Sequence, residues 1–333
     1  MYLQRRNRTL RRTESIRQIV RETLLTPADF MAPVFIVEGK DQKHEIPSMP
    51  GYYRYSLDLL VKEVKELYSL GVRAVNPYVK CSDGLKDNMG TESWNPDGLM
   101  QRAIREVKNA VPEMIVMSDV ALDPYSVYGH DGIVKDGHID NDPTVEALTR
   151  MSLSHAEAGV DFVAPSDMMD GRVAAFRMVL EKNGYGHVGI MSYAAKYASC
   201  FYSPFRDALD SAPVDTQDIP KDKKTYQMDP ANRREAVKET LDDIDEGADM
   251  VMVKPAMAYL DILREVRNAV DVPVCAYQVS GEYAMIKAAA QNGWLDGEKS
   301  MMESLLCIKR AGADLVSTYF AKEAAKVLNK YNA

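Results

Sequence analysis

Two lysines follow apolar runs of this sequence. The run MVMVKPAM (250–257) places Lys254 after alternating Val and Met, and the run HVGIMSY (187–193) comes shortly before Lys196. A lysine amine attacks a ketone only when it is neutral, so its pKa must fall from about 10.4 to about 7. Burial lowers a lysine pKa, and a second ammonium nearby lowers it further. The pair therefore predicts Schiff-base chemistry, against the alternative that each lysine pairs with an acid or extends into solvent.

Acidic residues gather in the segment SDVALDPYSVYGHDG (118–132), which holds Asp119, Asp123 and Asp131 beside His130. Carboxylates with a histidine can hold a hard cation such as Mg²⁺ or position a water molecule. Asp is also a common turn residue. The segment alone leaves both interpretations open.

A long loop, 199–228, follows Lys196 and combines aromatic with basic residues. Phe205 supplies apolar cover, while Arg206 and Lys223 supply positive charge. Such a loop suits a lid that closes over an anionic substrate and shields it from water. The alternative is a solvated charged loop.

Four similar phrases recur along the chain, each with a Gly ahead of an apolar, β-rich run. They are 70–78, 158–166, 246–255 and 311–320. Because Gly supplies the left-handed conformation that ends a helix, each phrase predicts a helix end, a short loop and a buried strand. Four more apolar runs raise the number of predicted strands to eight: 32–37, 114–120, 187–193 and 272–280.

Amphipathic segments of helical length lie between these strands, for example 57–70, 142–158 and 229–246. The last two open with Asp-Pro, which predicts Asp142 and Asp229 as N-caps. The alternation predicts a (β/α)₈ TIM barrel, with a doubly wound open sheet as the alternative. No GxGxxG follows the first strand, so the dinucleotide-binding form of that alternative has little support.

Composition limits the class of protein. The chain has 333 residues, of which 46% are hydrophobic and 27% charged, with a formal net charge of −8. This charge disfavours nucleic acid and anionic membrane as partners, and no apolar stretch approaches the roughly 20 residues of a membrane-spanning helix. Four cysteines without CxxC spacing indicate reduced thiols in the cytoplasm, with neither a disulfide framework nor a thiolate zinc site.

The N-terminal MYLQRRNRTLRR carries five arginines and no acid. It could be a transit peptide, a nucleic-acid arm or an arm that packs on another subunit. The acidic remainder disfavours the nucleic-acid arm, and the lack of a small-residue cleavage signal weakens the transit peptide. We therefore expect residues 1–26 to form a packing arm and 27–333 to form the catalytic barrel.

From about residue 27 to 331 the chain resembles the porphobilinogen synthase, or 5-aminolevulinate dehydratase, family. Five motifs carry the resemblance: MVKPAMAYLDILREVR (252–267), APSDMMDGRV (164–173), SYAAKYASCFYSPFRDA (192–208), SDVALDPYSVYGHDG (118–132) and QVSGEY (278–283). The resemblance implies a hydro-lyase that condenses two 5-aminolevulinate molecules into porphobilinogen for haem and chlorophyll synthesis. It also implies a (β/α)₈ barrel with an N-terminal arm, a homo-octamer and no organic cofactor. A cytoplasmic location is expected, or the plastid stroma if the chain is a processed form.

The resemblance also assigns roles to residues. Lys254 and Lys196 would form the Schiff bases on the propionate and acetate sides of the product, and Asp119 is the candidate acid/base. Ser280 and Tyr319 would hold the first substrate's carboxylate. The remaining expected substrate-binding residues are Arg206, Lys223 and Gln227 for the second carboxylate, with Ser166 and Phe205 lining the site.

The expected metal is magnesium rather than zinc. Zinc-dependent members carry three cysteines at positions that read Ala121, Asp123 and Asp131 in this chain. None of these supplies a thiolate, so catalytic zinc is not expected. The pattern resembles the aspartate-rich, magnesium-requiring branch, in which Glu239 matches the ligand of an allosteric Mg²⁺. Asp123 and Asp131 are further candidate metal ligands in the active site.

Two rival functions remain at this stage. A single-Schiff-base aldolase would use Lys254 but leave Lys196 and the basic lid without a role. A non-catalytic binding barrel would use both lysines only to grip carboxylates, and it would form no covalent adduct that borohydride can trap.

Overall fold

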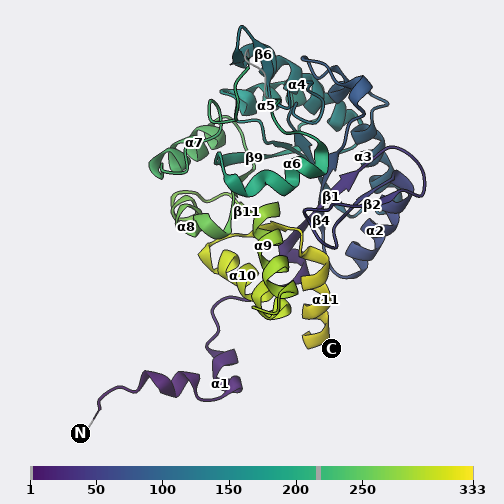
Figure 1. The fold of residues 1–333 in the computed structure, drawn as a ribbon. Helices are drawn as coiled ribbons and strands as arrows, with labels where there is room; N and C mark the ends of the chain where they lie inside the picture. Colours follow the sequence, from purple (N-terminus) through teal and green to yellow (C-terminus); the bar gives the residue numbers. More distant parts are fainter. Residues whose placement is uncertain (1–2, 215–218, 333) are drawn as a thin grey trace.

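A closed barrel of parallel strands forms the body of the molecule, as the computed structural model of residues 3–214 and 219–332 shows (Figure 1). One sheet of ten strands closes on itself through β12 and β1, and two of the ten belong to the side hairpin β2–β3. The other eight are the predicted barrel strands: β1 Phe30–Ile36, β4 Ala74–Val79, β5 Ile115–Val120, β8 Phe162–Pro165, β9 Gly189–Lys196, β10 Met250–Lys254, β11 Val274–Gln278 and β12 Leu315–Thr318. The predicted (β/α)₈ barrel is confirmed.

The glycine phrases end helices as predicted. Gly71, Gly159, Gly247 and Gly312 have φ values of 95°, 94°, 109° and 127°, and each stands three residues before the first residue of a barrel strand. A residue with a Cβ is strained in this conformation, so Gly ends the helix at little cost. The strands that follow are buried on both faces, as expected for a parallel sheet covered by helices.

Helices connect the barrel strands. They are α2 Leu57–Ser69, α3 Leu99–Ala110, α4 Asn141–Glu157, α5 Arg172–Lys182, α6 Ser203–Leu209, α7 Arg234–Asp245, α8 Leu260–Ala269, α9 Ser280–Gln291, α10 Gly297–Ala311 and α11 Ala321–Asn332. The helix α6 lies in the lid loop after β9, and the others cover the outside of the barrel. Short 3-10 turns lie between some of these elements: η2 Pro27–Asp29, η3 Asp83–Leu85, η4 Thr91–Trp94, η5 Cys200–Tyr202 and η6 Met257–Tyr259.

Both predicted Asp-Pro N-caps are wrong. The helix α4 begins one residue earlier than Asp142 and has Asp140 at its N-cap. The helix α7 begins at Arg234, well after Asp229. The carboxylate of Asp229 instead accepts a hydrogen bond from the backbone N–H of Ala231 at 2.8 Å, which makes a local turn ahead of the helix.

Two hairpins lie in the loops that connect barrel strands to the helices that follow them. The pair β2 Lys43–Glu45 and β3 Tyr53–Tyr55 lies between β1 and α2, and β3 pairs with the end of β1. The pair β6 Ile133–Lys135 and β7 His138–Asp140 lies in the loop after β5. The expected lid, 199–228, contains η5 and α6, and its residues 215–218 lie outside the described part of the chain.

The N-terminal segment extends away from the barrel (Figure 1). It contains η1 Asn7–Arg11 and α1 Glu14–Ile19, and neither has a buried residue. The division into a packing arm of residues 1–26 and a catalytic barrel of residues 27–333 stays a prediction, and residues 1–2 lie outside the described part. Among the described helices, none combines the length and apolar character needed to cross a membrane.

Candidate active site

The two lysines stand side by side at the C-terminal mouth of the barrel. Lys254 and Lys196 are the last residues of β10 and β9, and they are register partners across these parallel strands. Adjacent strands lie about 4.8 Å apart, and residues in register point to the same face. Each lysine is only 6% exposed. Their adjacency follows from barrel topology, since the carboxyl ends of all parallel strands meet at one rim.

Four aromatic rings surround the amine of Lys254. Its Nζ lies 4.5 Å from the ring centroid of Tyr277, 5.0 Å from that of Phe205, and 5.2 Å from those of Tyr193 and Tyr202. No ion pair of this amine with a described acid is present. Burial, and then the charge of Lys196, lower the pKa of Lys254 to about 7. The amine is therefore partly neutral at neutral pH, as the sequence predicted.

Lys196 has polar partners instead. Its Nζ donates to the backbone oxygen of Ser166 and to Asp131 Oδ2 at 3.3 Å. Lys223 Nζ donates to the other oxygen of Asp131 at 2.7 Å and to Asp123 Oδ2 at 3.2 Å. Although burial alone raises it, the charges of Lys196 and Lys223 hold the pKa of Asp131 below its ordinary value. Asp131 is thus a permanent counter-ion that links the strand end to the lid.

Asp119, at the end of β5, is 5% exposed and has a different environment. Burial, and then the neighbouring charge of Asp123, raise the pKa of Asp119 to about 7, although the hydroxyl of Ser166 donates to this carboxyl group. Its Oδ1 has no hydrogen-bond partner among the residues that the structure describes. A carboxyl group that titrates near neutral pH and keeps a free oxygen is suited to proton transfer.

The expected carboxylate-binding residues lie around this centre. Tyr319, directly after β12, is buried and shares a hydrogen bond of 2.8 Å with the hydroxyl of Tyr277. Ser280 Oγ, at the start of α9, accepts the N–H of Phe205 at 3.0 Å. Arg206 follows on α6, and no ion pair of its guanidinium with a described acid is present. In this arrangement Arg206 is the cation left available for a second carboxylate.

Lys223 and Gln227 are also in the site, but they are engaged. Both are buried, and Gln227 Nε2 donates to Asp131 Oδ2 at 3.3 Å. Gln227 Oε1 has no partner. These contacts show that the lid already closes against the loop after β5, even though sequence reasoning expected both groups to face a substrate.

The candidate metal ligands separate into two groups. Asp123 and Asp131 face lysine ammonium groups, which take the positions that a cation would need, so a metal does not fit there. Glu239 on α7 is half-buried and lines a cavity of about 410 Å³ together with Glu235, Asp170 and other residues. Among the described residues no cluster of three or more His, Cys, Asp or Glu side chains could hold a metal.

Sequence reasoning missed the aromatic cage. Tyr193 and Tyr277 belong to β9 and β11, where tyrosine is an ordinary strand residue, and Tyr202 is one of several aromatic residues of the lid loop. The available signal was their position: Tyr193 lies three residues before Lys196, and Tyr277 lies at the end of the next strand beyond Lys254. That placement at the barrel mouth would have identified them.

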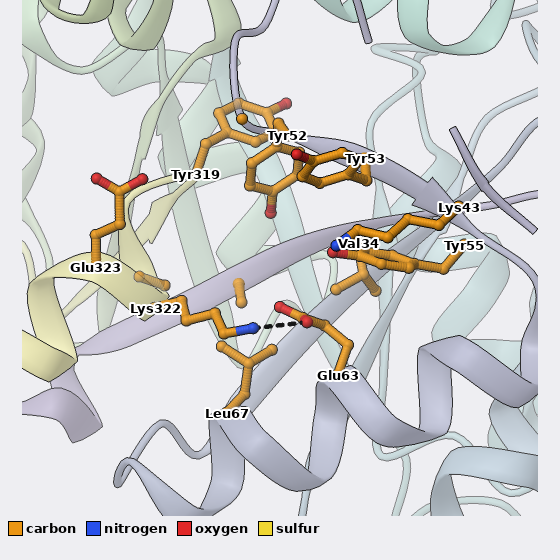
Figure 2. Close-up of a pocket in the computed structure, with 13 residues that line it drawn as sticks. Val34, Lys43, Tyr52, Tyr53, Tyr55, Glu63, Leu67, Tyr319, Lys322 and Glu323 are labelled. Atoms are coloured by element: carbon orange, nitrogen blue, oxygen red, sulfur yellow. Dashed lines mark hydrogen bonds and ion pairs between the residues drawn. The ribbon is translucent and has the colours of Figure 1, made fainter. Parts of the chain in front are cut away.

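A second cavity of about 140 Å³ lies between β1, the hairpin β2–β3, α2 and α11. Figure 2 shows the ion pair of Lys322 with Glu63 (2.7 Å) along one wall and Tyr52 beside Tyr319 on the other. Neither Lys196 nor Lys254 lines this cavity. Lys322 and Glu323 are each ion-paired and Lys43 lies over the ring of Tyr53, so we do not assign the chemistry to this cavity.

Two neighbouring buried lysines at the mouth of a closed parallel barrel are typical of barrel enzymes that form Schiff bases with carbonyl substrates. A family model described as Delta-aminolevulinic acid dehydratase matches residues 4–327. The chain belongs to this delta-aminolevulinic acid dehydratase family. The family, the fold and the enzyme class, a lyase of porphyrin biosynthesis, are thereby confirmed.

Similar proteins come from several groups of organisms. A delta-aminolevulinic acid dehydratase of Halalkalibacterium halodurans is 49% identical over 98% of this chain and 97% of its own length. That of Bradyrhizobium diazoefficiens is 52% identical over 97% of this chain and 90% of its own. The solved structure of the Toxoplasma gondii enzyme, in complex with its reaction product porphobilinogen, superposes with a TM-score of 0.95 at 49% identity, covering 98% of this chain and 92% of that one.

Proposed function

We propose that this chain condenses two molecules of 5-aminolevulinate into one porphobilinogen and two water molecules. The observation that carries the proposal is the register pairing of Lys196 with Lys254, both buried at one barrel mouth. A single-Schiff-base aldolase needs only one of them. Two adjacent amines match a reaction that must activate two ketones at once.

The steps follow from this pairing. Neutral Lys254 attacks the C4 ketone of one substrate. Lys196 first gives up a proton to solvent and then attacks the ketone of the other, and each addition loses one water to give an iminium ion. Loss of a proton next to one iminium gives an enamine, whose carbon bonds to the iminium carbon of the second substrate. Elimination then releases one lysine, the free amino group of a substrate displaces the other, and a final proton loss gives the pyrrole.

Positioning supplies most of the rate gain. Holding two dilute reactants in register can be worth an effective molarity of about 10⁵ M or more. Tyr319 and Ser280 are the groups that would hold the first carboxylate, and Arg206 would hold the second. The aromatic cage keeps water from Lys254, which protects the iminium ion and keeps the amine neutral.

Asp119 would carry protons during these steps. Its pKa of about 7 lets it accept and return a proton near neutral pH, and among the described residues one of its carboxyl oxygens has no hydrogen-bond partner. Asp131 has the opposite role, because its pKa is held low and its carboxylate stays charged as the counter-ion of Lys223.

For the metal we propose one Mg²⁺ in the cavity beside Glu239. Burial raises the pKa of Glu239, while the charges of Lys238 and Arg172 lower it and those of Asp243 and Asp170 raise it. Mg²⁺ commonly binds through one or two carboxylates and keeps several waters, which suits a cavity that Glu239 lines. In this place the ion would supply positive charge to α7 as an allosteric activator and would take no part in the condensation.

For the assembly we propose a homo-octamer in which the N-terminal arm packs on another copy. In the arm, the exposed fractions are 57% for Leu10, 81% for Ile19 and 64% for Leu24, which gives an apolar surface that a second copy could cover.

The four cysteines are free thiols, which supports a reducing compartment such as the cytoplasm.

Turnover of single-lysine variants tests the proposed function. The wild-type chain with Mg²⁺ should convert 5-aminolevulinate to porphobilinogen, and Lys196→Met and Lys254→Met should each abolish it. Lys224→Met is the matched control, because the side chain of this lid lysine is 71% exposed and, within the described part of the chain, forms an ion pair with Asp222. The two-lysine scheme fails if either buried-lysine variant keeps activity within about tenfold of wild type, a barrier change of only about 1.4 kcal/mol.

A further inference from the structure

The lid helix α6 needs support from outside itself. It has seven residues, Ser203–Leu209, which is too short to be stable alone. Yet it carries Phe205, whose ring lies 5.0 Å from the Lys254 amine, and Arg206, the cation available for the second carboxylate. Any contact that fixes α6 therefore fixes two groups of the active site.

The hairpin β2–β3 supplies such contacts at the C-terminal end of α6. Arg54 on β3 donates from Nε to the backbone oxygen of Ala208 at 2.5 Å and from Nη2 to that of Asp207 at 2.7 Å. Ser48, between the two strands, donates to the side chain of Asp207 at 2.5 Å. Carbonyl groups in the last turn of a helix lack intrahelical partners and favour a positive charge, so Arg54 acts as a C-terminal cap.

No competing ion pair draws Arg54 away from α6. The side chain is half-buried, and no ion pair of its guanidinium with a described acid is present. A neighbouring contact reinforces it: Asp210, directly after α6, pairs with Lys80 at the end of β4. The helix end is thus tied to two different parts of the barrel rim.

The hairpin is itself fixed to the barrel wall. Arg54 is the register partner of Phe35 on β1. The ring of Phe35 contacts that of Phe205 at 5.7 Å and stacks on that of Tyr319 at 5.9 Å. Tyr52, two residues before Arg54, packs edge-on against Tyr319 at 5.0 Å, and Figure 2 shows these two rings together. The same hairpin therefore contacts the residue that would hold the first carboxylate and the helix that would hold the second.

We propose that Arg54, assisted by Ser48, is a positioning residue that latches α6 over the active site. It touches neither lysine and acts through Phe205 and Arg206. The inference rests on the proposed function for its effect on catalysis, while the latch itself is a property of the structure alone.

Hydrogen exchange tests the latch without reference to activity. In Arg54→Ala, amide exchange in the peptide that covers 203–211 should rise about tenfold or more, the factor that one lost charge-assisted hydrogen bond can produce, while barrel peptides stay protected. Lys43→Ala is the matched control. This variant removes a cation from the same hairpin. The Lys43 amine lies 4.1 Å from the ring centroid of Tyr53, which is on β3 rather than on α6. Ser48→Ala, a milder change, should raise exchange in the same peptide by a smaller factor.

Steady-state kinetics test the consequence for catalysis. Arg54→Ala should raise KM for 5-aminolevulinate about tenfold with a smaller change in kcat, and Arg54→Lys should recover part of the loss because it restores one donor. Lys43→Ala should match wild type. Unchanged exchange over 203–211 in both Arg54→Ala and Ser48→Ala would overturn the latch. A wild-type chain that forms no porphobilinogen would overturn the proposed function instead, and the exchange result would still decide the latch.

Discussion

At the scale of the residue, the environment of Lys254 sets two effects against each other. Four aromatic rings within 5.2 Å favour the ammonium form, by about 0.5–2 kcal/mol for a cation–π contact. Burial and Lys196 favour the neutral amine, and a pKa of about 7 corresponds to roughly 5 kcal/mol against the charge. The second effect is larger, so the cage functions mainly as an apolar shield around a nucleophile.

The pH dependence of Schiff-base formation follows from this balance. Trapping of substrate on Lys254 should rise as pH increases through about 7, because the neutral amine is the nucleophile. In Lys196→Met the neighbouring charge is gone, so the pKa of Lys254 rises and the midpoint of trapping moves to higher pH. The rate of borohydride-trapped adduct formation between pH 5.5 and about 10 measures both midpoints. A midpoint in the variant equal to or below that of wild type would contradict this electrostatic account.

Replacement of Lys254 should stabilise the fold even though it abolishes activity. In the unfolded chain a lysine has its ordinary pKa, whereas folding lowers that of Lys254. Folding therefore penalises the ammonium fully below about pH 7, and wild-type stability from this group rises between about pH 7 and 10.5. Lys254→Met should abolish turnover yet raise the free energy of unfolding by about 1–4 kcal/mol at pH 6, with less gain at pH 9. Urea unfolding at the two pH values checks this, and destabilisation at pH 6 would refute it.

The sequence predicted where the candidate reactive residues lie but not which groups they contact. Lys254, Lys196 and Asp119 could be predicted because each follows an apolar strand run and thus lies at the barrel mouth. Asp131 was predicted only as a candidate metal ligand. Its actual partners, Lys196 and Lys223, lie 65 and 92 residues away along the chain. Local patterns carry no information about such contacts, so the counter-ion role emerges only from the folded structure.

At the scale of the element, one buried carboxylate joins two of the loops that carry candidate site residues. Glu282 on α9 is fully buried. Its Oε1 accepts the N–H groups of Met257 at 2.7 Å and Ala258 at 3.3 Å, and its Oε2 accepts that of Val279 at 2.8 Å. One carboxylate thus joins the loop after β10, which follows Lys254, to the turn after β11 that presents Ser280.

Removal of this carboxylate should loosen both loops. Glu282→Ala leaves three buried amide donors without a partner and should lower the free energy of unfolding by about 3 kcal/mol or more. Glu282→Gln keeps one acceptor and should cost less. Glu298→Ala, an exposed acid at the start of α10, is the control and should stay within about 0.5 kcal/mol of wild type. Chemical denaturation measures all three, and equal stability of Glu282→Ala and Glu298→Ala would contradict the assignment.

Strands were easier to predict than helix starts. The eight strands follow from Gly-terminated helices and continuous apolar runs, both of which are local features. Asp229-Pro230 has the same local signature as an N-cap, but its side chain bonds to Ala231 within a turn, and α7 begins later. An Asx-turn and an N-cap use the same residue types, so sequence alone does not separate them.

At the scale of the whole molecule, the N-terminal arm has little to hold it against its own barrel. The segments η1 and α1 have no buried residues, and their apolar side chains face outward. Isolated helices of this length are marginal in water, so the proposed packing on another copy would stabilise the arm.

Truncation tests that requirement. A chain that lacks residues 1–25 should keep the barrel and its lysines but assemble into a smaller particle than the full chain, since the proposed packing surface is gone. Native mass spectrometry or light scattering at matched concentration measures the change. An identical particle mass for both chains would show that the arm is not a packing element.

Covalent trapping of the substrate on both lysines is the most direct test of the central claim. The folded chain, with Mg²⁺ and excess 5-aminolevulinate, would be reduced with borohydride, and its intact mass and peptides mapped. The account predicts reduced substrate adducts on Lys254 and on Lys196, and none on the exposed control Lys224. Adducts on Lys254 alone under all conditions would indicate a single-Schiff-base enzyme, and the absence of adducts from both buried lysines would contradict the two-lysine mechanism altogether.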